Sequence, residues 1–369
     1  MKYYLIAGER SGDFHAANLM RALRQQDPTA EFRFWGGDQM QAIGGELVHH
    51  YQEMAIMGFW EAATSLLKFR GYLKEAQQDL LSWKPDVVIL VDYAGFNMRI
   101  AKFAKVQGIK TFYYISPKIW AWNQGRVHQV KKVVDRMFVI LPFEEEFYQG
   151  FDYKVDYIGN PTSDAVAEHP VSADFYQRNH LDPERPIIAV LPGSRKQEIE
   201  EMLFEMTAII PPFLDYQFIV AGVDNLDANY YAHFERNNVR IIFDQTYDLL
   251  AHAKAALVTS GTATLETALF DVPQVVCYRT SAVSYAISKA VIKVKFISLV
   301  NLIAGREVVK ELIQGEFNSR NLVTELKKIT ADEAFIARQK AGYAEIRAKL
   351  GQQRAAEKAA KLMVGYLKK

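Results

Sequence analysis

Hydrophobic and polar residues follow two alternating patterns along the first part of the chain. Short apolar runs predict buried strands, and the segments between them carry apolar residues at the helical period. Strands are expected at 3–7, 31–35, 86–91, 111–115, 136–140 and 155–158, and helices at 14–25, 57–81, 98–107, 124–134 and 144–148. This alternation is typical of a parallel, doubly wound sheet.

A second alternation follows residues 161–186, a stretch of prolines, acids and polar residues near whose start we place the interdomain linker. From about residue 318 the pattern is helical only. Strands are expected at 187–191, 217–220, 239–242, 255–258 and 274–278, and helices at 198–210, 228–237, 247–252, 262–270 and 355–367.

These patterns predict an α/β protein with two doubly wound, Rossmann-like domains that face each other across a cleft. The N-terminal domain is expected over residues 1–163 and the C-terminal domain over 164–345. The C-terminal helix, about 346–369, is expected to pack back on the first domain, with exchange between two copies as an open alternative.

Composition narrows the class of protein. Of the 369 residues, 50% are hydrophobic and 24% charged, which fits globular domains. The formal net charge of +1 argues against a broad nucleic-acid-binding surface. The lone Cys277 excludes an intrachain disulfide and indicates a reducing cytoplasm. Glu9 and Arg10 interrupt the first apolar run, so it is read as a strand and not as a signal peptide, and no stretch has the apolar length of a membrane span.

The most informative segment is Ser260–Glu266, which joins an apolar run to a helical one. A helix start offers unpaired backbone N–H groups and the positive end of the helix dipole, which suit a phosphate. An ordinary helix cap by Ser260 or Thr262 is the alternative. Ser260, Gly261, Thr262 and Glu266 are therefore candidate contacts to a phosphate-bearing ligand, with Glu266 positioned to accept hydrogen bonds from sugar hydroxyls.

A second turn of this kind follows the first strand of the same domain. Gly193 and Ser194 allow the backbone to approach a ligand closely, and Arg195 offers a planar fork to phosphate oxygens. Two such turns predict a diphosphate ligand, as in a nucleotide sugar. The sequence has no Asp-X-Asp loop, no His/Cys cluster and no P-loop, so we expect neither a metal nor a cofactor.

In the first domain, Gly8–Asp13 directly follows the first strand, where Glu9, Ser11 and Asp13 are candidate substrate contacts. A turn capped by Asp13 is the alternative. Asp92 ends another apolar run, at the edge where sheets of this type bind ligands. There it could act as general base on a hydroxyl, or be held by loop amides.

Aromatic and basic segments suggest an apolar substrate. Trp120 and Trp122 lie close together in a loop and could stack on a sugar, line an acyl channel or staple the loop. Segment 285–297 mixes apolar residues with three lysines, and segment 57–72 is aromatic and amphipathic. Either alone is read as a helix packed on a sheet, but together they favour a substrate from the membrane.

In this order and spacing, these segments resemble the lipid-A-disaccharide synthase family of glycosyltransferases, which has the two-domain GT-B architecture. The resemblance runs from Leu5 to about Gln314. The matching segments are Ala7–Glu9, Ser11–Asp13, Met57–Gly58, Asp92 with Phe96–Asn97, Ser116–Pro117, Trp120–Trp122, Leu141–Glu144, Leu191–Arg195, Ser260–Glu266, Asn301–Glu307 and Glu311–Gln314.

The resemblance implies a metal-independent, inverting transfer of 2,3-diacylglucosamine from UDP to the 6-hydroxyl of 2,3-diacylglucosamine 1-phosphate. The products are the β-1,6-linked lipid A disaccharide 1-phosphate and UDP. It implies that Asp92 is the base, that Ser260–Glu266 is the UDP-binding turn, and that Arg195 and Asn301 matter for activity. Gln314 is carried over as a substrate contact. Many members have a second acid three residues after the first, where this chain has Gly95.

The resemblance also implies peripheral contact with the cytoplasmic face of the inner membrane, and a homodimer is left open. One alternative is another enzyme of the same fold acting on a UDP-sugar, such as an epimerase or a transferase with a soluble acceptor. The other is a non-enzymatic nucleotide- or lipid-binding module, against which the acid at Asp92 argues.

Overall fold

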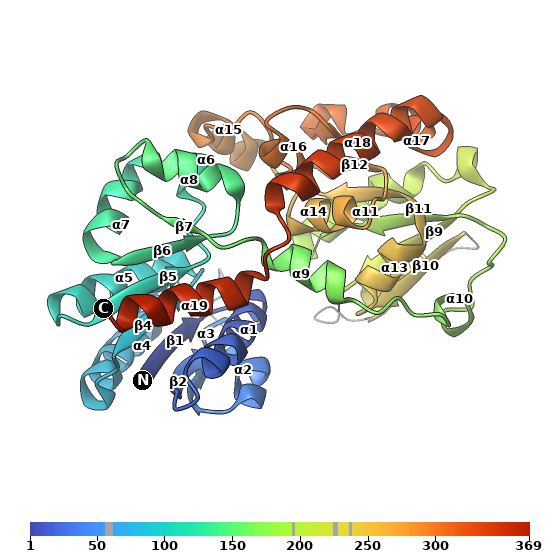
Figure 1. The fold of residues 1–369 in the computed structure, drawn as a ribbon. Coiled ribbons are helices and arrows are strands. Elements are labelled where there is room, and N and C mark those ends of the chain that lie inside the picture. Colours follow the sequence, from blue (N-terminus) through green and yellow to red (C-terminus); the bar gives the residue numbers. More distant parts are fainter. Residues whose placement is uncertain (56–61, 194–195, 224–227, 236–237) are drawn as a thin grey trace. The chain divides into compact units, whose positions relative to one another are not determined.

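The computed structural model describes residues 1–369 except 56–61, 194–195, 224–227 and 236–237 (Figure 1). The chain forms two compact units. Unit 1 comprises Met1–Pro161 and Gln352–Lys369, and unit 2 comprises Thr162–Gly351. Each unit has its own sheet and buried core, so each is described separately.

Unit 1 is built on a seven-stranded sheet in the order β3-β2-β1-β4-β5-β6-β7, and every strand pair is parallel. This confirms the doubly wound sheet expected from the alternating pattern. Its strands are β1 (Lys2–Ala7), β2 (Glu31–Gly36), β3 (Glu46–His50), β4 (Val87–Val91), β5 (Lys110–Tyr114), β6 (Arg136–Val139) and β7 (Asp156–Tyr157).

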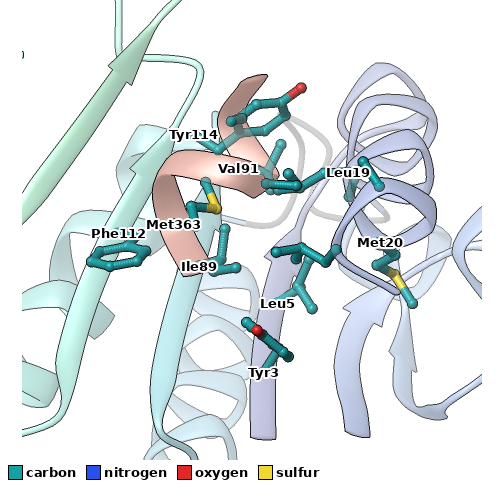
Figure 2. Close-up of a cluster of buried hydrophobic side chains, with 14 of the residues drawn as sticks. Tyr3, Leu5, Leu19, Met20, Ile89, Val91, Phe112, Tyr114 and Met363 are labelled. Atoms are coloured by element: carbon teal, nitrogen blue, oxygen red, sulfur yellow. The ribbon is translucent and has the colours of Figure 1, made fainter. Parts of the chain in front are cut away.

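Successive strand residues point to opposite faces of the sheet, and in these strands both sets are apolar. Helices therefore cover both faces. On one face, α1 and α19 lie side by side, so the last helix belongs to the first core. Figure 2 shows part of this cluster, with Leu19 from α1 and Met363 from α19 over the strand residues Leu5, Ile89 and Val91. The helices of unit 1 are α1 (Arg10–Gln26), α2 (Asp38–Ile43), α3 (Tyr51–Ala55), α4 (Ala62–Trp83), α5 (Ala94–Val106), α6 (Ile119–Trp122), α7 (Val127–Val133), α8 (Pro142–Gln149) and α19 (Ala355–Leu367).

Unit 2 has a six-stranded parallel sheet in the order β10-β9-β8-β11-β12-β13. Its strands are β8 (Ile187–Leu191), β9 (Gln217–Gly222), β10 (Val239–Phe243), β11 (Ala253–Thr259), β12 (Gln274–Tyr278) and β13 (Lys310–Ile313). Its helices are α9 (Pro161–Glu168, which begins at the last residue of unit 1), α10 (Phe175–Arg178), α11 (Lys196–Ala208), α12 (Ala228–Ala232), α13 (Thr246–His252), α14 (Thr262–Leu269), α15 (Ala282–Val291), α16 (Leu299–Ala304), α17 (Ser319–Ala331) and α18 (Glu333–Leu350).

Candidate active site

In unit 1, the ends of three neighbouring strands bring the candidate residues together. The register pairs Ala7 of β1 with Val91 of β4, and Val91 with Tyr114 of β5, so all three strands end at one edge. The sheet order reverses between β1 and β4, and doubly wound sheets bind ligands at such a switch point. Glu9 lies in the segment that follows β1, and Asp92 directly follows β4. The loop after β5 leads to Trp120.

Asp92 lies in an unusual turn between β4 and α5. Asp92 and Tyr93 both have φ of +44°, in the left-handed region, which costs roughly 1–3 kcal/mol for each non-glycine residue. The Asp92 carbonyl oxygen accepts hydrogen bonds from the Tyr113 hydroxyl and from Asn97 Nδ2, the latter at 2.9 Å. Asn97 also donates to the carbonyl of Val91 at 3.1 Å, so two buried side chains hold the turn in this conformation.

The surroundings of the Asp92 carboxyl suit a proton acceptor. Burial raises its pKa above the ordinary value, while the charge of Lys118 and the backbone N–H of Tyr93 lower it. A base works best when its pKa approaches the working pH while its ionised form stays populated. The direction of this shift fits a proton acceptor at the edge where a substrate is expected.

The segment after β1 is a helix start and not the open turn expected from the sequence. α1 begins at Arg10, and Glu9 is its extended N-cap residue. Ser11 is exposed in the first turn, next to the exposed Glu9. Gly8 is required here because a Cβ atom would lie 2.3 Å from the ring of Tyr93.

Asp13 is 2% exposed, and its carboxylate accepts hydrogen bonds from three backbone amides. The donors are Gly37 N at 2.7 Å, Gln39 N at 3.1 Å and Met40 N at 3.2 Å. These amides belong to the start of α2, so Asp13 fixes α2 against α1. The helix that Asp13 caps is thus α2 and not the helix in which it lies, and a substrate contact of Asp13 stays a prediction.

The two tryptophans differ in exposure. Trp120 is 5% exposed and packs edge-to-face on Phe143, with ring centroids 4.9 Å apart. Trp122 is 41% exposed, and the guanidinium of Arg126 lies 4.8 Å from its ring centroid. Of the two, Trp122 presents the surface on which a sugar or an acyl chain could lie.

Glu144 is a buried acid that reasoning from the sequence assigned no role. Its carboxylate accepts hydrogen bonds from Leu141 N at 2.9 Å and Ile140 N at 3.2 Å, and it is hydrogen bonded to the Ser116 hydroxyl. Burial raises the pKa of Glu144 to about 7, although these hydrogen bonds oppose the shift. Glu144 thereby ties the loop after β5 to the start of α8.

In unit 2, the two turns that were expected to bind phosphate follow the neighbouring strands β8 and β11. The register pairs Leu191 at the end of β8 with Val258 in β11, so both turns lie at one edge of this sheet. Gly193 has φ of +106°, a conformation that favours glycine. Ser194 and Arg195 lie outside the described residues.

The turn after β11 presents the start of α14. Gly261 is the N-cap residue and has no side chain to accept hydrogen bonds from the first amides. Gly261 and Thr262 are exposed. Ser260 does not cap the helix, because Gly261 holds the N-cap position and no side chain makes a capping hydrogen bond. The Ser260 hydroxyl instead donates to the carbonyl of Ile297 at 2.9 Å. The start of α14 therefore keeps the amides and the dipole that an anion requires.

Glu266 lies one turn further along α14. One carboxylate oxygen accepts a hydrogen bond from the Tyr247 hydroxyl at 3.0 Å. Burial raises the pKa of Glu266, and the hydrogen bond from Tyr247 opposes this rise. Tyr247 thus orients the carboxyl that was expected to meet sugar hydroxyls.

Asn301 is fully buried, and its side chain is hydrogen bonded to other groups of the protein. Its Oδ1 accepts from Val308 N at 2.7 Å and Val309 N at 3.0 Å, and its Nδ2 donates to Val309 O and Glu311 Oε1, each at 2.9 Å. The other oxygen of Glu311 accepts from Ile297 N at 3.0 Å. Since the carbonyl of Ile297 accepts the Ser260 hydrogen bond, Asn301 is connected through Glu311 to the turn before α14.

Gln314 is engaged in a similar way. It has φ of +53°, and its side chain exchanges hydrogen bonds with the backbone of Thr280, accepting at 3.3 Å and donating at 3.0 Å. Gln314 thereby links the end of β13 to the segment after β12. A substrate contact of Gln314 stays a prediction.

Both segments expected to meet a membrane expose apolar side chains. Val291 and Ile292 are each 41% exposed beside the exposed Lys293, and Leu67 on α4 is 68% exposed. Residues 57–60 of the aromatic segment lie outside the described residues. In the described part of the chain no helix is long and apolar enough to cross a bilayer, and no group of three or more His, Cys, Asp or Glu side chains is placed to hold a metal ion.

The chain is similar in sequence to lipid-A-disaccharide synthases. The family model described as lipid-A-disaccharide synthetase matches residues 3–364. The lipid-A-disaccharide synthase of Myxococcus xanthus is 37% identical over 370 residues, covering 98% of this chain and 97% of the relative. That of Syntrophus aciditrophicus is also 37% identical, covering 99% of this chain and 97% of the relative.

Solved structures with the same fold are more distant in sequence. A UDP-GlcNAc 2-epimerase from Neisseria meningitidis bound to UDP-GlcNAc has a TM-score of 0.68 at 14% identity, covering 100% of this chain and 99% of that one. An S. aureus MnaA–UDP co-structure has a TM-score of 0.70 at 14% identity, with coverage of 100% and 97%. The calicheamicin glycosyltransferase CalG4 has a TM-score of 0.65 at 18% identity, with coverage of 100% and 98%. They confirm the expected fold class.

Proposed function

The chain belongs to the lipid-A-disaccharide synthetase family, and from this membership and the placement of Asp92 we propose how it forms the lipid A disaccharide. It is a glycosyltransferase of lipid A biosynthesis. We assign as donor UDP-2,3-diacylglucosamine and as acceptor 2,3-diacylglucosamine 1-phosphate. The products are the β-1,6-linked disaccharide 1-phosphate and UDP.

Asp92 is the proposed general base, and its position is the observation that carries the proposal. It takes the proton of the acceptor 6-hydroxyl as that oxygen attacks the anomeric carbon from the side opposite UDP. A new C–O bond forms while the bond to the diphosphate oxygen breaks, so the anomeric centre inverts. The partly desolvated carboxyl at the end of β4, with its raised pKa, supports this role.

The leaving diphosphate gains negative charge as its bond to the sugar breaks. We assign its stabilisation to the amides of Gly261 and Thr262 at the start of α14. Ser194 and Arg195 are further candidates on the grounds of the sequence alone. The loss of one such contact is expected to cost about 3 kcal/mol of transition-state stabilisation.

Both substrates carry acyl chains, and we propose that the protein takes them from the cytoplasmic face of the inner membrane. The exposed Val291 and Ile292 beside Lys293 support contact between this part of unit 2 and an anionic bilayer. Vesicles of phosphatidylglycerol and of phosphatidylcholine test this contact. We expect the protein to sediment with the former at low salt, and equal binding to both would contradict the proposal.

The reaction is tested by incubating both substrates with the protein and identifying the products by mass spectrometry. We expect the disaccharide 1-phosphate and one UDP per disaccharide. Asp92→Ala is expected to lower turnover by about 10²- to 10⁴-fold while UDP still binds in a calorimetric titration. Near-normal turnover of this variant would exclude Asp92 as the base, and an epimer formed from UDP-N-acetylglucosamine alone would favour the epimerase alternative.

A further inference from the structure

A cavity of about 460 Å³ lies in unit 1 between α5, the loop after β5 and α7. Its size falls within the range of small-molecule sites, about 300–1,000 Å³. Apolar side chains line part of it, among them Met98, Ile119 and Val133. No single segment of the sequence predicts this cavity, because its walls come from separate segments.

The cavity adjoins the proposed base. Ala94 and Gly95, in the first turn of α5 directly after Asp92 and Tyr93, form part of its wall. Pro117 and Ile119 also line it, on either side of the Lys118 whose charge acts on Asp92. A Cβ atom at Gly95 would meet nothing within 4 Å, so the wall is open at this point.

Apart from Gln129, the polar side chains that line the cavity are cationic. Arg99, Lys102, Arg126 and Lys132 are exposed side chains that line the cavity, and the described lining residues include no acid. Arg99 lies over Phe69 at 5.1 Å and hydrogen bonds to the carbonyl of Gly95. In the described residues, none of the four makes a salt bridge with a carboxylate.

Two neighbouring lysines on α5 and α7, by contrast, form ion pairs with carboxylates. Lys105 on α5 pairs with Asp135 at 2.6 Å, and Lys131 on α7 pairs with Asp152 at 3.3 Å. Neither of these lysines lines the cavity. The cations that do line it therefore have charge left for a bound anion.

We propose that this cavity binds the phosphate of the acceptor together with the first part of an acyl chain. This inference rests on the proposed function, because the acceptor is the substrate whose hydroxyl must reach Asp92. The donor's diphosphate is already assigned to the turns of unit 2. A phosphate at the cationic rim and an acyl stem on the apolar lining match the two kinds of surface that the cavity offers.

The test compares two double variants with the same loss of charge. Lys102→Ala with Lys132→Ala removes two cavity cations, and Lys105→Ala with Lys131→Ala removes their paired neighbours. Each is assayed with the acceptor and with the same diacylglucosamine lacking its phosphate. We expect the cavity variant to raise the KM for the phosphorylated acceptor about tenfold, which corresponds to about 1.4 kcal/mol. The KM for the donor and for the unphosphorylated acceptor is expected to stay unchanged, as are all constants of the control.

An equal rise for both acceptors, or no rise for either, overturns the cavity as a phosphate site. If the cavity variant loses binding to phosphatidylglycerol vesicles but keeps its acceptor KM in detergent micelles, the cations belong to a membrane surface and the proposal is wrong. If the unaltered protein forms no disaccharide, the proposed function has failed. Equilibrium binding of the two acceptors to the unaltered protein and the cavity variant then tests the cavity alone: preference for the phosphorylated acceptor must be present in the former and lost in the latter.

Discussion

Tyr113 donates a hydrogen bond from its phenolic hydroxyl to the backbone carbonyl oxygen of Asp92. Tyr113 is fully buried in β5, and Asp92 directly follows the neighbouring strand β4. The bond thus joins two strands at the point where the chain adopts a left-handed turn. It holds the residue proposed as base through its backbone and leaves the carboxyl for the substrate.

Tyr113→Phe is expected to lower turnover about tenfold, with little change in either substrate KM. The ring stays in the core, while the left-handed turn at Asp92 loses one of its two side-chain hydrogen bonds and places the carboxyl less well. The free energy of unfolding should fall by about 1 kcal/mol, the usual worth of one hydrogen bond. Steady-state kinetics and urea unfolding measure both effects.

Tyr153→Phe is a matched control, since its hydroxyl donates to the carbonyl of Val134 at 3.2 Å in the same core. We expect a similar loss of stability without a loss of turnover. If the two variants lose turnover equally, the bond from Tyr113 has no positioning role.

The acidic limb of kcat/KM should reflect the raised pKa of Asp92. Since the ionised carboxylate is the active form, activity should fall as the pH drops through this pKa, which lies above the ordinary value for an aspartate. Lys118 lowers the pKa of Asp92, so Lys118→Met should move the limb to higher pH. A pH–rate profile of the unaltered protein and the variant measures this.

Salt provides a control for this prediction. Lys118 is exposed, so high ionic strength should screen its charge and move the limb of the unaltered protein in the same direction. The salt effect should be smaller in Lys118→Met. A limb that stays in place or moves to lower pH in the variant contradicts the assigned role of Lys118.

Glu144 should make stability depend on pH. The folded protein raises the pKa of Glu144 from 4.5 to about 7, so over this window it keeps a proton that the unfolded chain has released. The free energy of unfolding therefore falls as the pH rises from about 4.5 to about 7, by up to about 3 kcal/mol from this group. Glu144→Gln cannot titrate and should reduce this fall.

Urea unfolding at several pH values between 4.5 and 7.5 measures the effect of Glu144→Gln. Glu146→Gln on the same helix is the control, because it makes the same change at an exposed position. The control is expected to keep the slope of the unaltered protein. An equal slope in all three proteins would show that burial of Glu144 does not govern the pH dependence.

The sequence predicted the central strands because burial on both faces makes them continuous apolar runs, as in β4 and β8. It missed β3 and β13, which lie at sheet edges. Glu46 begins β3 and is exposed, and β13 contains Lys310 and Glu311, so neither strand shows an apolar run. A strand at the edge of a sheet is less buried than a central one, so its sequence carries a weaker apolar signal. Its position is set by hydrogen bonds to the neighbouring strand, which the sequence pattern does not reveal.

The positions of candidate residues could be predicted where the residue closely follows a strand. Asp92 and Gly261 could each be placed within its own unit, because the parallel strands of one sheet end at the same edge. The partners of Asn301 and Asp13 could not, because they are backbone amides brought close only by the fold. For both residues the structure finds a role in holding the protein together, which a motif alone cannot distinguish from substrate contact.

Asn301→Ala should destabilise unit 2 in the absence of any substrate. It would leave the partly buried amide of Val308 and the buried amide of Val309 without their acceptor, and it would remove a donor from Glu311. Each buried group left without a partner costs about 1–3 kcal/mol, so the free energy of unfolding should fall by about 2–4 kcal/mol. Thermal or urea unfolding of the protein without UDP measures this.

The same variant should also weaken UDP binding through Ser260. Glu311 holds the amide of Ile297, whose carbonyl accepts the Ser260 hydrogen bond, so a looser Glu311 loosens the turn before α14. Ser260→Ala removes only the last link of this chain, and we expect it to weaken UDP binding with a smaller loss of stability. If Asn301→Ala keeps full stability without ligand but loses UDP binding or turnover, Asn301 acts on a substrate directly and the structural role assigned to it is wrong.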